Sequence, residues 1–381
     1  MTVVPAIDLF AGAGGLSVAA KKAGSDVVLH VDSDPLSCDT LRSNRRHHRG
    51  NVMESDVSLL TGRDLRRLAG LSARDPLLIV GGPPCQPFSK AAFWSEDGDD
   101  AAFRRARARG ESAPPPATHG HRPDDRRHLV KDFLRLVIEA HAAGFVFENV
   151  ASLLAPRNRP MLDAFLAESQ ASGFKTVVVR ANAVEFGAPQ RRDRVFVLAA
   201  RRCRPVPPEP THTLDRKRHP KRRLAKACGP VLAPFAGDEF AEPEESVSGR
   251  WAEHLQTVPP GWNYKAHTAW GGHPRPTFVT ETRFWNFLLK LSPDLPSWTI
   301  PANPGPWTGP FHWDTRRLRT AELAALQGFP RGYVFKGGRR DRVRQIGNAA
   351  PPALGAPMIA AVISAITGAR RSPHREPAWS V

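Results

Sequence analysis

A short stretch from Gly81 to Ser89, with the sequence GGPPCQPFS, constrains the fold of this chain more than any other. It follows the apolar run PLLIV at 76–80, which is short and β-branched enough to be a buried strand of a parallel sheet. Ligands of open α/β sheets bind beyond the carboxyl ends of such strands. Prolines on both sides of Cys85 fix φ and remove backbone donors, so the stretch predicts a thiol presented on a stiff turn. An isolated cysteine at a strand end is more often core filling, so further motifs must decide between the two roles.

A glycine-rich turn follows the first predicted strand. Residues 3–9 form an apolar strand candidate, the sequence DLFAGAGGLS runs from Asp8 to Ser17, and a helical pattern continues to Lys22. The glycines let the backbone approach a ligand closely, but Ser17 stands where a dinucleotide-binding fingerprint has its third glycine. The turn therefore predicts a ligand-binding loop without identifying the ligand.

Acidic residues follow the next two predicted strands. The strand at 26–31 ends at Asp32, a position from which a carboxylate can accept hydrogen bonds from both hydroxyls of a ribose. The alternative role for Asp32 is capping of the following helix, for which Ser33 or Asp34 is better placed. A third strand candidate leads to Asp56. For Asp32 the ribose role is favoured over capping.

A carboxylate closes a further apolar strand at 144–150, which has the sequence GFVFENV. Burying Glu148 in such a strand costs free energy unless a partner compensates for it, so either a structural ion pair or a functional acid is expected. Arg192 and Arg194 lie two residues apart in a predicted strand and should point to the same face. Both arginines can then reach one site.

The charge of the chain favours a polyanionic partner. The formal net charge is +17 and the isoelectric point is near 10.6. Nucleic acid is favoured over membrane because no basic amphipathic helix stands out and no apolar run approaches the length of a bilayer span. The N-terminus lacks the charged region of a signal peptide, so a cytoplasmic location is expected. No C-x-x-C spacing occurs among the four cysteines, so neither a zinc site nor a disulfide framework is indicated.

Taken together and in this order, the motifs resemble those of the DNA cytosine-5 methyltransferases of bacterial restriction-modification systems. The matching strings are DLFAGAGG at 8–15, PCQPFS at 84–89, ENV at 148–150, QRRDR at 190–194 and QIGNAAPP at 345–352. The resemblance implies an α/β fold with a doubly wound, mostly parallel sheet of the Rossmann-like type found in methyltransferases that depend on S-adenosylmethionine. It also implies three parts: a catalytic domain at 1–202, a smaller inserted target-recognition domain at 203–315, and a segment at 316–381 that returns to the catalytic domain.

The resemblance implies a role for each motif residue. Cys85 would attack C6 of a cytosine, Glu148 would hold the base through N3 and its exocyclic amine, and Arg194, with Arg192, would steady the O2 side and the glutamate. The base would be flipped out of the duplex, and the polar segment at 90–123 would be a mobile loop that closes over it. The residues expected to bind S-adenosylmethionine are Phe10, Ala11, Gly12, Gly14, Gly15, Leu16, Asp32, Ser33, Asp56, Val57, Pro83, Leu129, Asn348 and Ala349.

The block from about Cys203 to Arg283 matches no family motif and is the expected site of sequence recognition. It contains a basic run at 216–223, which is either a solvated loop or a set of phosphate contacts. Seven of the nine tryptophans fall between Trp251 and Trp313, where a core role is favoured over nucleic-acid contact. The residues expected to contact DNA are Ser89, Arg216, Arg218, Arg250, Arg275 and Arg283.

Three other functions compete with a DNA methyltransferase. A dehydrogenase would explain the glycine-rich turn but would leave Cys85, Glu148 and the paired arginines without roles. A transfer-RNA cytosine-5 methyltransferase shares the motifs, although a recognition block of this size argues for DNA. A catalytically inactive DNA-binding relative is disfavoured because the nucleophile and the acid are both retained. The expected partner is double-stranded DNA, bound by a monomer that acts separately from any cognate restriction endonuclease.

Overall fold

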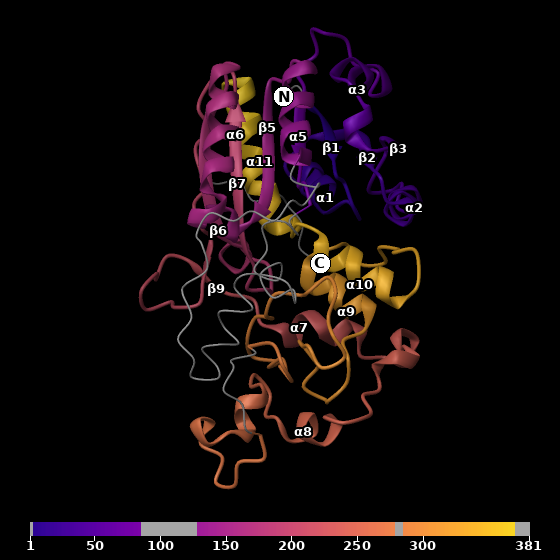
Figure 1. Cartoon of the computed structure of the whole chain (residues 1–381), viewed down its shortest axis with the longest axis vertical. Helices are drawn as coiled ribbons and strands as arrows, with labels where there is room; N and C mark the ends of the chain where they lie inside the picture. Colours follow the sequence, from indigo (N-terminus) through magenta and orange to yellow (C-terminus); the bar gives the residue numbers. More distant parts are fainter. Residues whose placement is uncertain (1–2, 85–127, 279–284, 370–381) are drawn as a thin grey trace, which may run out of the picture.

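The computed structural model describes residues 3–84, 128–278 and 285–369 (Figure 1). Several predicted residues lie outside these ranges, namely Cys85, Ser89, Arg283 and the predicted loop at 90–123.

A seven-stranded sheet with the order β3-β2-β1-β4-β5-β7-β6 forms the centre of the molecule. The pairs among β1 to β5 are parallel, and β7 runs antiparallel to both β5 and β6. The predicted mostly parallel α/β sheet is therefore confirmed. The strands are β1 (Pro5–Leu9), β2 (Asp26–Asp32), β3 (Asn51–Glu54), β4 (Leu78–Gly81), β5 (Gly144–Val150), β6 (Lys175–Asn182) and β7 (Asp193–Ala200).

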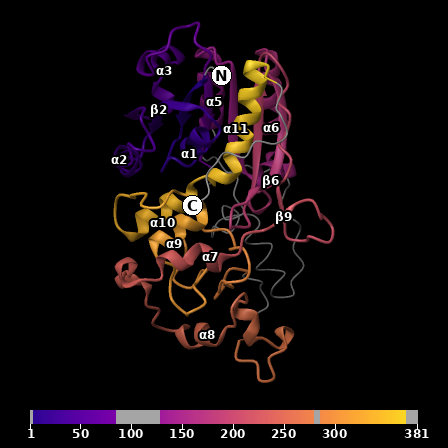
Figure 2. The ribbon, with the colours of Figure 1, turned by 180° about the vertical axis from the view of Figure 1, so that it is seen from behind.

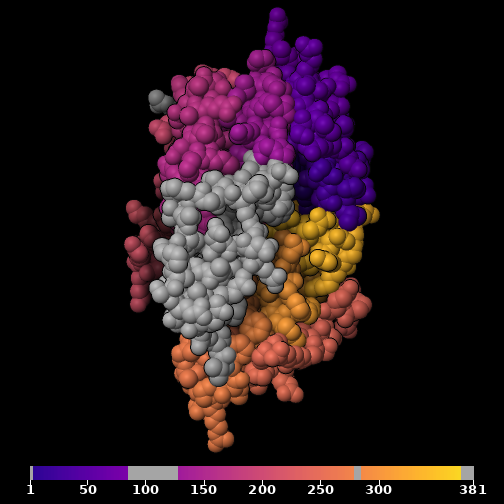
Figure 3. Space-filling model, viewed as in Figure 1, coloured from indigo at the N-terminus to yellow at the C-terminus, as the bar shows by residue number. Residues whose placement is uncertain are grey.

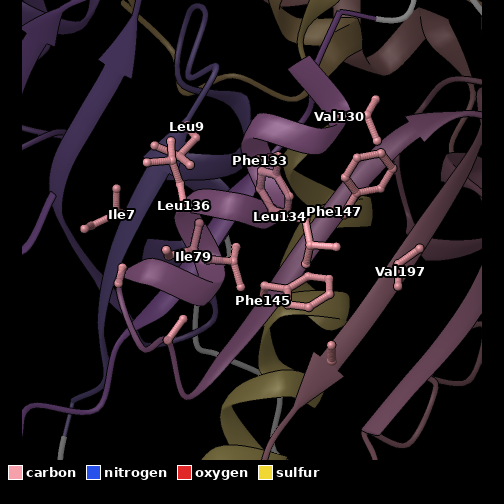
Figure 4. Close-up of a cluster of buried hydrophobic side chains, with 14 of the residues drawn as sticks. Ile7, Leu9, Ile79, Val130, Phe133, Leu134, Leu136, Phe145, Phe147 and Val197 are labelled. Carbon is pink, nitrogen blue, oxygen red and sulfur yellow. The ribbon is translucent and has the colours of Figure 1, made fainter. Parts of the chain in front are cut away.

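Helices cover both faces of this sheet, as the two opposite views show (Figures 1 and 2). Strand residues alternate between the faces because successive side chains of a strand point in opposite directions. Ile79, Phe145 and Phe147 pack in the core beneath α5 and α6 (Figure 4), whereas Leu78 and Val80 pack beneath α1 and α11. The helices of the sheet domain are α1 (Gly15–Lys22), α2 (Pro35–Ser43), α3 (Gly62–Leu68), α5 (His128–Glu139), α6 (Arg159–Ala171) and α11 (Pro352–Thr367).

Helix α11 is apolar because it packs against the sheet. Together with α10 it forms a helical stretch, Arg339–Thr367, that is long enough to span a membrane and contains an apolar window of 18 residues with a mean hydropathy of 1.7. However, 67% of that apolar window is buried inside the protein, where α11 contacts α1, β5 and β7. The apolar character of the stretch is therefore accounted for by core packing.

Residues 203–278 and 285–349, here named the second lobe, lie below the sheet in Figure 1 and are coloured from red through orange to yellow in Figure 3. One core of this lobe joins α7, α9 and α10 to the glycine-rich turn through Ala13 and Val18. A smaller core is built on Leu255, Tyr264 and Phe311. The elements of the lobe are β8 (His212–Thr213), β9 (Arg223–Leu224), α7 (Cys228–Leu232), α8 (Ala252–Thr257), α9 (Thr320–Gln327) and α10 (Arg339–Asn348).

Short 3-10 helices supply most of the remaining local structure in the described ranges. One of them ends β6: the side chain of Asn182, the last residue of that strand, accepts a hydrogen bond from Val184 N and starts a 3-10 turn. The 3-10 helices are Val57–Leu59, Ala151–Leu154, Pro156–Asn158, Ala183–Phe186, Ala233–Phe235, Asp238–Phe240, Pro243–Glu245, Tyr264–His267 and Ala269–Gly271.

Candidate active site

A cavity of about 280 Å³ opens at the carboxyl ends of the parallel strands, where ligands of such sheets bind. The structure brings together here every residue predicted to hold the cofactor except Gly14. Those that line the cavity are Phe10, Ala11, Gly12, Gly15, Leu16, Asp32, Ser33, Asp56, Val57, Pro83, Leu129, Asn348 and Ala349.

Gly14 serves the turn and does not line the cavity. It caps α1 in the left-handed conformation with φ of 85°, which favours glycine. A Cβ atom on Gly14 would lie 2.7 Å from Cε1 of His48, so a residue with a side chain at this position would clash with His48. A Cβ atom on Gly15 would lie 2.5 Å from the carbonyl oxygen of Ala350. The absence of a side chain at Gly15 therefore allows α1 to lie close to the C-terminal segment.

Asp32 ties the glycine-rich turn to the end of β2. Its Oδ2 accepts a hydrogen bond of 2.7 Å from Gly12 N, and its Oδ1 accepts one of 2.8 Å from Asp34 N. The cap of α2 is Asp34, whose carboxylate accepts from Ser37 N, so Asp32 is not the capping residue. Burial raises the pKa of Asp32, and the two backbone donors oppose that rise.

The opposite side of the cavity combines apolar and acidic groups. Phe10, Val57 and Leu129 supply apolar surface, and each also packs against the core under α5. Asp56 is exposed, and its Oδ1 accepts a hydrogen bond of 2.8 Å from Ser58 N at the start of a 3-10 turn. This arrangement is suited to a flat ring that carries a hydrogen-bond donor at its edge.

Glu148, which is buried, and Arg194, which is partly exposed, form an ion pair that lines the cavity. Nε of Arg194 lies 2.8 Å from Oε1 of Glu148, and both residues line the cavity. Burial raises the pKa of Glu148, while the positive charges of Arg194 and Arg192 lower it. A Cβ atom at Gly82 would lie 2.8 Å from Oε2 of Glu148, so the glycine at the end of β4 gives the carboxyl group its room.

Cys85 lies outside the described residues, but the turn that leads to it does not. Gly82, Pro83 and Pro84 all line the cavity, and Asn149 Nδ2 donates to the carbonyl oxygen of Pro83. The described part of this turn therefore ends at the same cavity as Glu148.

The structure corrects the expectation that Arg192 and Arg194 share one strand face. Strand β7 begins at Asp193, so Arg192 precedes it, and Arg192 does not line the cavity. The buried Arg192 guanidinium donates to the carbonyl oxygens of Ile300, Gly347 and Ala349, at 3.1, 2.6 and 3.2 Å. It fixes the C-terminal segment that carries Asn348, while its charge still acts on Glu148.

Asp8 is a cavity residue that the sequence analysis missed. It is fully buried, its Oδ2 accepts a hydrogen bond of 2.5 Å from Ser17 Oγ, and Ser17 Oγ lies 2.9 Å from Nδ1 of His30. Burial raises the pKa of Asp8 to about 7. The signal was the same one that identified Glu148, a carboxylate within an apolar strand.

Arg344 is a second missed residue, and it comes from the C-terminal segment. Its guanidinium lies 3.4 Å from Oδ2 of Asp34, and its charge lowers the pKa of Asp32. Arg344 and Asn348 are one helical turn apart on α10, so they lie on the same face of that helix. That spacing was visible in the sequence and marks the cavity-facing side of α10.

Four of the predicted DNA contacts lie within the described residues, and all four are exposed. Arg216 and Arg218 are exposed between β8 and β9, and Arg275 is exposed before the end of a described range. Arg250 is exposed and lies over the Trp251 ring at 4.8 Å.

Comparisons with known proteins agree with this geometry. A family model described as C-5 cytosine-specific DNA methylase matches residues 4–102 and 117–365. The Type II methyltransferase M.SacI of Streptomyces achromogenes is 34% identical over 94% of this chain and 93% of its own length. The Type II methyltransferase M1.HphI of Haemophilus parahaemolyticus is 28% identical over 94% of this chain and 86% of its own.

Solved structures share the fold. A protein described as a DNA modification methyltransferase encoded within an E. coli prophage superimposes with a TM-score of 0.66 at 20% identity, covering 96% of this chain and 99% of its own. The S. pombe Dnmt2 methyltransferase gives a TM-score of 0.53 at 15% identity, covering 95% of this chain and 99% of its own.

Proposed function

The chain belongs to the C-5 cytosine-specific DNA methylase family, and from this membership we propose a full reaction. The enzyme transfers the methyl group of S-adenosylmethionine to C5 of a flipped-out cytosine in a specific double-stranded DNA sequence, through a covalent bond between Cys85 and C6. The observation that carries the proposal is the Glu148–Arg194 ion pair, which shares one cavity with the turn that leads to Cys85.

Covalent attack solves the chemical problem of this reaction. C5 of cytosine is a poor nucleophile, and addition of the Cys85 thiolate to C6 makes C5 enamine-like, so one difficult step becomes two easier ones. C5 then takes the methyl group, loses its proton to a base, and the Cys85–C6 bond breaks to restore the ring. Since the reacting atoms are hidden in a stacked duplex, the base must first be flipped out.

Glu148 and Arg194 are assigned to the edge of the base that carries N3 and O2, away from the reacting atoms C5 and C6. The raised pKa of Glu148 favours its protonated form, which can donate to N3 as negative charge develops in the ring. Arg194 orients the carboxyl group through their 2.8 Å contact and can reach the O2 side. Arg192 acts as a positioning residue, because its guanidinium holds backbone carbonyl groups and does not line the cavity.

The cavity residues fit S-adenosylmethionine, which supplies an electrophilic methyl group when bound. Asp32 is assigned the ribose hydroxyls, Asp56 the adenine amino group, and Val57 and Leu129 the faces of the ring. The fit is supported by the acidic groups at two strand ends and by the apolar surface between them. Asn348 and Ala349 close the cavity from the C-terminal segment.

We retain the division into a catalytic domain at 1–202, a target-recognition domain at 203–315 and a returning segment at 316–381. Within the last segment α11 packs on the sheet, whereas α9 and α10 share a core with α7 of the second lobe. The protein is proposed to act as a monomer on DNA in the cytoplasm, associated with the nucleoid through that DNA and separately from any restriction endonuclease.

Bisulfite sequencing tests this proposal. Genomic DNA from a host without cytosine-5 methylation, expressing the wild-type chain, should contain cytosines protected from conversion within one recurring sequence. The empty vector and Glu148→Ala should give none. Protected cytosines found only in transfer RNA would favour the RNA methyltransferase, and none in either nucleic acid, despite folded protein, would overturn the proposal.

Asp32→Ala should weaken S-adenosylmethionine binding by about 1–3 kcal/mol, because it removes a charge-assisted acceptor. Calorimetry measures the effect. Asp26→Ala is the matched control, since Asp26 is exposed at the opposite end of the same strand. The methylated DNA sequence should stay the same. An unchanged cofactor affinity would mean that Asp32 does not bind the cofactor and only holds the glycine-rich turn in place.

A further inference from the structure

Five side chains from separate segments form a continuous series in which cations and indole rings touch. The guanidinium carbon of Arg191 lies 5.1 Å from the centre of the Trp298 ring, and the rings of Trp298 and Trp285 are 4.8 Å apart. Nζ of Lys265 lies 4.8 Å from the Trp285 ring and 5.0 Å from the Trp270 ring. We name these five residues the aromatic ridge.

The aromatic ridge begins beside the active site. Arg191 is three residues before Arg194, which pairs with Glu148. Backbone hydrogen bonds join the two segments: Arg191 N donates to Ser297 O at 2.7 Å, and Ser297 N donates to Pro189 O at 2.8 Å. The hydroxyl of Thr299 also donates to Arg191 O at 2.7 Å. The ridge therefore runs from the carboxyl edge of the sheet into the second lobe.

The ridge is not explained by core packing. Trp285 and Trp270 are 49% and 51% exposed, although their size would favour burial. Trp270 does meet Tyr264 of the smaller core, with ring centres 6.0 Å apart, but half of its surface stays exposed, whereas Trp251 and Trp307 pack against that core as partly buried residues. Among the described residues, the Lys265 and Arg191 side chains have no carboxylate partner within ion-pair distance. Two partly exposed cations and two half-exposed indoles thus lie together.

We propose that the aromatic ridge binds the substrate duplex on the flank of the target cytosine, with the indoles against the sugars of the backbone and the cations near phosphates. The inference rests on the proposed function for its ligand. Charge supports it, because a chain of net charge +17 attracts a polyanion and the ridge contributes two cations that have no carboxylate partner among the described residues. Aromatic side chains interleaved with cations hold single-stranded nucleic acid without reading its sequence, and the cations of such a surface can contact the phosphates of a duplex in the same way.

The ridge also refines the predicted DNA contacts. Arg250 and Arg275 were predicted as DNA contacts from the composition of their block alone. The ridge residues lie between positions 191 and 298, and the fold brings them into contact. Because Arg191 lies three residues before Arg194, the ridge is expected to act near the target base.

The test measures DNA affinity by fluorescence anisotropy with two short labelled duplexes, one with the sequence found by bisulfite sequencing and one of unrelated sequence. Trp285→Ala should raise the dissociation constant for both about tenfold, the usual cost of one lost aromatic contact to nucleic acid. Lys265→Gln should reduce the magnitude of the slope of log affinity against log salt concentration by about one, as expected when one phosphate contact is lost.

Matched controls separate a ridge effect from a general one. Trp262→Ala removes a tryptophan that is 50% exposed in the same lobe and has no ring contact with the ridge in the described structure. Lys175→Gln removes a lysine at the opposite edge of the sheet. Both should bind DNA as the wild type does, and all four variants should keep the wild-type cofactor affinity and unfolding midpoint.

The outcomes distinguish this inference from the proposed function. If Trp285→Ala and Lys265→Gln bind both duplexes as tightly as the controls while the wild type methylates DNA, the ridge proposal is wrong and the reaction stands. If the wild type methylates nothing but both ridge variants lose affinity for the unrelated duplex, the ridge binds DNA and the reaction is wrong. If Trp285→Ala does not fold, Lys265→Gln still decides the ridge proposal.

Discussion

Replacing Cys85 with serine should abolish methyl transfer, with a loss of at least about a thousandfold in rate, because a hydroxyl at neutral pH supplies almost no anion for covalent attack. Purified protein and radiolabelled S-adenosylmethionine measure the transfer directly. Cofactor binding should remain at the wild-type level, since the cavity residues that are assigned to the nucleoside do not include Cys85.

The other cysteines provide the controls for this variant. Burial raises the pKa of Cys38 and of Cys228 to about 12, so neither thiol can supply a thiolate at neutral pH. Cys203 is exposed beyond the end of β7, at the edge of the sheet opposite the cavity. Cys203→Ser should therefore transfer at the wild-type rate. Near-normal transfer by Cys85→Ser would show that the reaction does not pass through that thiol.

Replacing Glu148 with glutamine should slow transfer by about 10²–10⁴-fold, because the amide cannot supply a proton to N3 as charge develops in the ring. Glutamine keeps the shape of the side chain, and its carbonyl oxygen can still accept from Arg194, so the guanidinium keeps a partner. Single-turnover kinetics at saturating cofactor isolate the effect on the chemical step.

Glu139→Gln is the matched control, because Glu139 is also paired with an arginine, Arg135, but lies at the far end of α5 from the cavity. It should leave the rate unchanged. Wild-type single-turnover rates in Glu148→Gln would remove Glu148 from the reaction and leave it a structural ion pair. Equal losses of rate and of unfolding midpoint in both variants would point to general destabilisation.

The sheet was predictable because burial leaves a local pattern. Strand β5 has the bounds expected from GFVFENV, since a run of apolar residues between helical segments marks a strand covered on both faces. The order of the strands then places the ends of β1, β2, β4 and β5 at one edge, so residues far apart in sequence meet there. This is why a list of cavity residues could be written from motifs alone.

What the sequence did not reveal depends on contacts between distant segments. Arg192 was expected to face the base because it lies two residues from Arg194, but the start of β7 falls between them and the Arg192 side chain turns to the C-terminal segment. The ridge tryptophans were indistinguishable from core tryptophans, since exposure depends on packing. Asp8 followed the same rule as Glu148 and was overlooked within its motif.

Trapping on a modified substrate tests covalent attack most directly. A duplex that carries 5-fluorocytosine at the target position cannot lose its C5 substituent after methyl transfer, so the enzyme should remain bonded through Cys85. Incubation with S-adenosylmethionine followed by denaturing electrophoresis should give a band that contains both protein and DNA, and Cys85→Ser should give none. Absence of that band, under conditions in which the unmodified duplex is methylated, would contradict the covalent mechanism.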